Sequence, residues 1–239
     1  MKEIANLTDF LLWLECAVLA FLLFKNPLKK YWVFLFGSLS VASFAGGITH
    51  TFFDEPGTFA HLFWWDVTLL CIGITATCCF MLAVQTWKLP CLPAVMNSGK
   101  ALGANNEAPK DSHSPTGSRI NTSSTKSVQC LRCALAVLFV YTLFILSGQR
   151  PFLSAIVLYL PASIYLLIAM VRRLRKTKEP CAPIGILGMA LTFVAAGVQQ
   201  SKLSLPELSL NYNAIYHLIQ AVGLFLMFLY ARKTVSEDF

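Results

Sequence analysis

The sequence predicts an all-α integral membrane protein built from seven membrane-spanning helices. The chain has 239 residues, of which 56% are hydrophobic and only 13% are charged, whereas about a quarter of the residues in a soluble domain are charged. The apolar residues also gather in runs of roughly 20, the length that a helix needs to cross a bilayer. Each run is expected to be a helix, because an open strand cannot satisfy its backbone in hydrocarbon.

Seven such runs follow one another along the chain, and the predicted spans are residues 7–24, 32–53, 60–86, 129–147, 151–171, 183–200 and 212–230. The short turns NPLKK and GQRP join the first span to the second and the fourth to the fifth, so each pair should be antiparallel neighbours. Residues 97–128 are rich in Ser, Thr, Asn, Gly and Pro, a composition that cannot bury enough surface to fold. We therefore expect one membrane domain over 1–239, with a disordered cytoplasmic loop at 97–128.

The positive charges predict the orientation of the spans, because cytoplasmic loops carry an excess of Lys and Arg. Sixteen of the 19 Lys and Arg residues lie after the first, third, fifth and seventh spans, and the other three are Lys2, Arg150 and Lys202. Asp9 is counted here with the acidic residues of the less basic side. The N-terminus is expected outside and the C-terminus in the cytoplasm.

The net charge of +7 is then a consequence of topology, with some attraction to the anionic lipids of the inner leaflet. Nucleic-acid binding is not predicted, because no basic stripe interleaved with aromatic residues lies on a soluble element. Membrane lipid is the expected partner, and a multi-pass membrane protein is the expected localisation. The sequence does not indicate which membrane contains the protein or which proteins bind to it.

Four ionisable residues lie deep enough in the spans to indicate function: Glu15, His50, Asp66 and His217. Such a residue costs on the order of 3 kcal/mol at the centre of a span and usually faces the bundle interior. With a rise of about 1.5 Å per residue, His50, Asp66 and His217 fall in one layer below the outer surface, and Glu15 lies somewhat deeper. We expect the three to face one another.

Helical spacing adds polar neighbours to this layer. Asn213, His217 and Gln220 are at positions i, i+4 and i+7 of the seventh span, so they share one face. Ser43 has the same relationship to His50 on the second span. Asn213, Gln220 and Ser43 are therefore candidate ligand-binding residues. Gln199 and Gln200, at the outer end of the sixth span, are further polar groups that this layer can include.

Two neutral imidazoles and a carboxylate form a reasonable ligand set for zinc with an open position for water. In this hypothesis His50, His217 and Asp66 bind the metal, and the bound water acts as a hydrolytic nucleophile. Asp66 or Glu15 then serves as ligand, as the residue that orients a ligand, or as general base.

Other interpretations remain open. A His near a helix end can simply bond a backbone carbonyl, which is the expectation for His61 beside an aromatic belt. Asp66 can cap or pair locally, and Glu15 can bond a neighbouring helix. His50 and His217 can also serve as the two axial ligands of a haem.

The pattern of seven spans, a His late in the second, an Asp early in the third and a His early in the seventh resembles the CREST superfamily. This group includes the alkaline ceramidases and the adiponectin-receptor-like (PAQR) proteins, which are membrane hydrolases with an intramembrane zinc. By this resemblance His50, Asp66 and His217 take the places of metal-site residues. The motif is incomplete, since Gly46 replaces the Ser one turn before His50, and Asn213 stands where a second His of the seventh span is expected.

The resemblance implies a zinc-dependent hydrolase that cleaves an amide or ester in a lipid such as a ceramide. The missing second His favours the alternative, a non-catalytic seven-helix protein, receptor-like or scaffolding, that keeps the polar layer for packing or ligand binding.

Overall fold

The computed structural model describes residues 2–53, 55–88, 121–148, 152–204 and 211–234. These residues form seven α-helices and one short 3-10 helix, η1 (Pro27–Lys29). The α-helices are α1 (Lys2–Phe24), α2 (Lys30–Phe52), α3 (Phe59–Lys88), α4 (Asn121–Leu146), α5 (Phe152–Thr177), α6 (Ala182–Ser201) and α7 (Tyr212–Thr234). All seven are long and apolar enough to cross a membrane, so the protein is a multi-pass integral membrane protein.

Each helix coincides with a predicted span, and each extends beyond that span at one end or at both. The predicted fourth span began at residue 129, whereas α4 begins at Asn121, within the stretch 97–128 that was predicted to be a disordered loop. The part of this loop at 97–120 lies outside the described residues. Helix α5 continues past 171 to Thr177, so Arg172, Arg173, Arg175 and Lys176 belong to the helix. Long basic side chains tolerate this position because their apolar stems lie along the bilayer while the charges reach the interface.

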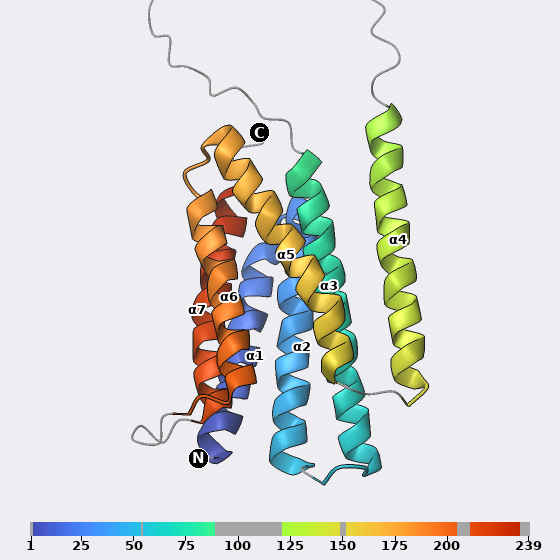
Figure 1. Ribbon diagram of the computed structural model, residues 1–239, viewed down its shortest axis with the longest axis vertical. Coiled ribbons are helices and arrows are strands. Elements are labelled where there is room, and N and C mark those ends of the chain that lie inside the picture. Colours follow the sequence, from blue (N-terminus) through green and yellow to red (C-terminus); the bar gives the residue numbers. More distant parts are fainter. Residues whose placement is uncertain (1, 54, 89–120, 149–151, 205–210, 235–239) are drawn as a thin grey trace, which may run out of the picture.

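Six helices form a closed ring in the order α1, α2, α3, α5, α6, α7, with α7 packed against α1. Helix α4 packs on α3 outside this ring and stands to one side of it (Figure 1). Helices α1, α3, α5 and α7 begin at one end of the bundle, which we call the N-terminal face. We call the opposite end, where these helices finish, the C-terminal face.

The apolar core fills mainly the half of the ring nearer the C-terminal face. Trp32 of α2 packs edge-on against Tyr230 of α7, with ring centroids 6.1 Å apart. Phe36 and Met170 are fully buried in the same cluster. A smaller cluster around Leu69 and Tyr141 fixes α4 to α3, where the Tyr141 hydroxyl donates a hydrogen bond to the Leu69 carbonyl, 3.2 Å away.

Candidate functional site

The best-defined ionisable pair in the membrane part joins α1 to α7. Oδ1 of Asp9 lies 2.7 Å from Nε2 of His217, and the two side chains are 8% and 13% exposed. The other ring nitrogen of His217, Nδ1, is buried and has no hydrogen-bond partner among the described residues. The ring of Tyr216 stands edge-on to the imidazole, with centroids 4.6 Å apart. Asp9 thus holds the imidazole in one orientation.

Sequence reasoning counted Asp9 with the acidic residues outside the membrane, and the structure corrects this assignment. Asp9 is 6% exposed and lies within the bundle. One signal was available: Asp9 falls inside the predicted span 7–24. Since α1 and α7 both start at the N-terminal face, residues early in both helices lie at similar depth and can meet.

His50 does not face the bundle interior as the layer hypothesis required. It is exposed near the end of α2, whereas its neighbour Thr49 is completely buried. Successive helix positions differ by about 100° around the axis, so one residue separates an inward from an outward side chain. Thr49 uses its hydroxyl to donate a hydrogen bond to the Ala45 carbonyl, 2.8 Å away.

Asp66 and Glu15 are both partly buried, on α3 and α1. No group of three or more His, Cys, Asp or Glu within the described part of the chain is close enough to hold a metal ion. Within the described structure His50, Asp66 and His217 are therefore not gathered into one such group. Zinc binding itself stays a prediction for metal analysis.

The alternative proposed for His61 is confirmed. Its Nδ1 lies 2.7 Å from the Phe53 carbonyl oxygen, and its ring stacks on Trp65 with centroids 6.5 Å apart. This imidazole closes the connection between α2 and α3 and takes no part in a deeper site.

A cavity of about 310 Å³ lies inside the ring, between α2, α3, α5, α6 and α7. We call it the central cavity. Much of its wall is apolar, and its polar groups are hydroxyls and amides from Thr75, Tyr159, Thr192, Gln199, Gln200, Tyr216 and Gln220. Among the described residues that line it, none carries a charge. It extends from the end of α6 at the N-terminal face to Gln220, eight positions into α7.

Gln220 is the most deeply buried amide in the wall of the cavity. The residue is 5% exposed, whereas Gln199 is partly buried and Gln200 is exposed. An amide taken from water without a compensating hydrogen bond costs roughly 1–3 kcal/mol in proteins. The buried amide therefore favours an occupant that can bond to it, a water or a ligand.

Of the three residues predicted to bind a ligand, one lines the central cavity and two do not. Gln220 lines the central cavity together with Gln199 and Gln200, as their placement in one polar layer suggested. Asn213 and Ser43 are partly buried and lie outside the lining of the cavity. His217 shares a helix face with Gln220 in the sequence pattern, yet it is turned toward α1 and Asp9.

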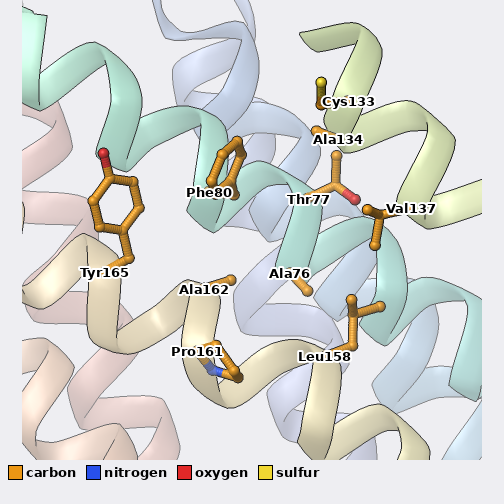
Figure 2. A pocket seen from close by; sticks show the side chains of 10 residues that line it. All are labelled: Ala76, Thr77, Phe80, Cys133, Ala134, Val137, Leu158, Pro161, Ala162 and Tyr165. Carbon is orange, nitrogen blue, oxygen red and sulfur yellow. The ribbon is translucent and has the colours of Figure 1, made fainter. Parts of the chain in front are cut away.

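A second cavity, also about 310 Å³, lies where α4 stands beside α3 and α5. Figure 2 shows it surrounded by side chains from these three helices, with Pro161 of α5 opposite Cys133 and Val137 of α4. Its wall is almost entirely apolar, and the hydroxyl of Thr77 already donates to the Gly73 carbonyl. This surface suits acyl chains of the surrounding bilayer.

The chain matches the model of the family described as a family of unknown function (DUF6962) over residues 4–97 and 118–235. Residues 98–117, which the match leaves out, fall within the stretch predicted to be a loop. Neither the curated proteins nor the solved structures contain a match to this chain. Because the matched segments cover most of the chain, the chain belongs to the DUF6962 family.

Proposed function

We propose that this protein is a non-catalytic, receptor-like seven-helix membrane protein that binds a neutral amphipathic lipid in its central cavity. The observation that carries the proposal is the buried amide of Gln220 in the wall of the central cavity. A primary amide has donors and acceptors, so it suits a hydroxyl or amide of a ligand.

The rest of the wall supports a ligand of this class. Ligand cavities commonly measure about 300–1,000 Å³ and combine apolar walls with a few polar groups. A cavity of about 310 Å³ fits a polar headgroup with its first few carbon atoms, leaving the tail to reach the bilayer. The distance between α5 and α6 increases toward the N-terminal face (Figure 1). The exposed Gln200 lines the cavity at this end of α6. A charged headgroup would find no partner among the described residues of the wall.

The test compares wild type with Gln220→Leu and Asn213→Leu, since Asn213 is on the same helix outside the cavity. Each full-length protein is purified in detergent and titrated with N-hexanoyl-sphingosine, dioctanoylglycerol and dioctanoyl-phosphatidylserine. We expect at least one neutral probe to raise the melting temperature of wild type and of Asn213→Leu, and not that of Gln220→Leu. Equal responses of all three proteins, or a response to phosphatidylserine alone, would refute the proposal.

Lipid hydrolysis is the second candidate, and the Asp9–His217 pair is the observation that favours it. A carboxylate that bonds one imidazole nitrogen and leaves the other available is the usual support of a metal-binding or proton-transferring His. The residues that would complete such a site are not gathered around His217 in the described structure. This candidate needs stoichiometric zinc in the purified protein and release of fatty acid from ceramide or a glycerolipid. Purified protein with neither property would exclude it.

The orientation belongs to the same proposal: the N-terminal face is outside the cytoplasm. The end of the central cavity that is lined by Gln199 and Gln200, which we call its mouth, lies at this face. The excess of Lys and Arg at the other end of the spans supports this orientation. Exposed positions at the two faces, Glu55→Cys and Arg175→Cys, can be introduced with Cys133→Ser and treated with a membrane-impermeant maleimide. In sealed right-side-out vesicles only Glu55→Cys should react. Labelling of Arg175→Cys alone would reverse the orientation.

A further inference from the structure

A small basic pocket lies at the C-terminal face, between the ends of α3 and α5, at the opposite end of the bundle from the mouth of the central cavity. Its volume is about 70 Å³, and its polar lining includes Arg172, Arg173 and Lys176 of α5 together with Trp87 of α3. This is roughly twice the volume that a water molecule occupies in the liquid. We call it the basic pocket. It has room for one compact polar group and none for an acyl chain.

Two of its cations are held in place by their surroundings. The guanidinium carbon of Arg172 lies 3.8 Å from the centroid of the Trp87 ring, a cation–π contact that fixes the side chain without neutralising it. Arg173 is 12% exposed and its Nε pairs with Glu179, yet its Nη1 is buried without a hydrogen-bond partner among the described residues. By contrast, Arg175 is exposed and lies outside the lining.

The charges predict what the pocket accepts. Three cations line it, and Glu179 pairs with one of them, so two positive charges remain for a ligand. A phosphate monoester carries a charge of about −1.5 to −2 and three acceptor oxygens, which matches this excess better than a singly charged phosphodiester. Arginine suits such a group because its planar fork can bond two oxygens.

The level of the pocket along the bundle indicates that the phosphate belongs to a lipid. The candidate membrane spans of α3 and α5 end at Trp87 and Thr177, so the pocket lies at the ends of these spans, where hydrocarbon is expected to give way to headgroups. Trp is enriched at this boundary, and basic pockets between spanning helices bind lipid headgroups there. We infer that the basic pocket binds the phosphate monoester of an anionic membrane lipid, held by Arg172, Arg173 and Lys176.

The experiment uses the full chain in detergent and measures lipid binding by native mass spectrometry. The probes are dioctanoyl phosphatidic acid (a monoester), dioctanoyl phosphatidylserine and phosphatidylcholine (both diesters), and inorganic phosphate. Phosphatidic acid should bind most tightly, because it alone joins a monoester to an apolar part. If inorganic phosphate bound as tightly as phosphatidic acid, the pocket would be a site for a soluble phosphate. The inference would also be overturned if phosphatidic acid and phosphatidylserine bound no more tightly than phosphatidylcholine.

Matched variants distinguish binding in the basic pocket from general attraction by the positive charge of the C-terminal face. Arg172→Gln and Lys176→Gln should each weaken binding of phosphatidic acid about five-fold, the effect of one basic residue near a membrane surface. Arg175→Gln removes the same charge from the same helix outside the pocket and should leave the affinity unchanged. If Arg175→Gln lost as much affinity for phosphatidic acid as the lining variants, only the net charge would matter, and the proposed site would be refuted. Neither lining variant removes the Arg173–Glu179 pair, so folding is expected to be preserved, which the melting temperature of each variant checks.

Discussion

Oδ1 of Asp9 lies 2.7 Å from Nε2 of His217, and this contact joins the first helix of the bundle to the last. Helices α1 and α7 are the neighbours that close the six-helix ring. Both side chains are largely buried, so each partner satisfies a polar group that would otherwise face hydrocarbon. The pair is thus a structural link as well as the strongest remaining argument for chemistry at this level of the membrane.

The first prediction concerns this pair. His217→Ala leaves the Asp9 carboxylate buried without its partner, which should cost about 1–3 kcal/mol of unfolding free energy or more. Asp9→Asn keeps an oxygen in the same place and should cost less. His50→Ala is the matched control, because His50 is exposed and such substitutions usually change stability by less than about 0.5 kcal/mol. Thermal or denaturant unfolding of the purified variants measures these differences.

A double-mutant cycle separates the contact from other effects of the two substitutions. Asp9→Ala, His217→Ala and the double variant should be non-additive, because residues in direct contact typically show interaction energies of about 0.5–3 kcal/mol. If the losses simply add, the two side chains do not stabilise each other, and the link between α1 and α7 depends on apolar packing alone.

The second prediction concerns the buried ion pair at the C-terminal face. Glu179 is 5% exposed, pairs with Arg173 and accepts a hydrogen bond from the Cys181 thiol at 2.9 Å. Glu179→Leu would leave the guanidinium buried and uncompensated, a loss typically near 3–5 kcal/mol. Replacing both residues, as Arg173→Met with Glu179→Leu, should recover much of it.

Unfolding of these variants in detergent tests the pair. Glu55→Gln removes a carboxylate from an exposed connection and should leave the melting temperature almost unchanged. A double variant as unstable as Glu179→Leu alone would contradict the prediction, since the damage would then come from lost packing and not from an unpaired charge.

The number of helices and their approximate positions were predictable because the thickness of the bilayer sets the shortest apolar run that can cross it. A span must be about 20 residues long and apolar, and this requirement located α6 as well as the longer helices. The start of α4 at Asn121 was not predictable in the same way. Its first two turns are polar, with Asn, Thr and Ser, so composition alone reads them as loop, whereas a helix that has already formed in the membrane can continue into water.

The candidate site was harder to predict because the spans are apolar on most sides. In such helices the sequence gives depth, which follows from the count of residues, but it gives the rotation of each helix poorly. His50 was predicted to face the bundle interior, whereas it is exposed and its neighbour Thr49 is buried. Gln220 is buried and lines the central cavity, as expected for a polar side chain in the middle of a span, which usually faces the bundle interior.

The third prediction concerns the close approach of α6 and α7, which form part of the wall of the central cavity. A Cβ added at Gly188 would lie 2.7 Å from the Gly223 carbonyl oxygen and 3.0 Å from the Met227 backbone nitrogen. These are backbone atoms, so the helices must separate to admit a methyl group. Membrane helices lack a strong hydrophobic force between them and depend on such contacts, and overpacking typically costs about 1–3 kcal/mol.

Gly188→Ala should therefore lower the unfolding free energy by about this amount, although Ala is the better helix former by about 1 kcal/mol. Gly197→Ala is the matched control on the same helix, because a Cβ there would meet nothing within 4 Å. It should be neutral or slightly stabilising, for the reason of helix propensity alone. Unfolding of both variants under one set of conditions gives the comparison. If Gly188→Ala were as stable as Gly197→Ala, the backbones of α6 and α7 would have to lie farther apart at Gly188 and Gly223 than they do in the structure.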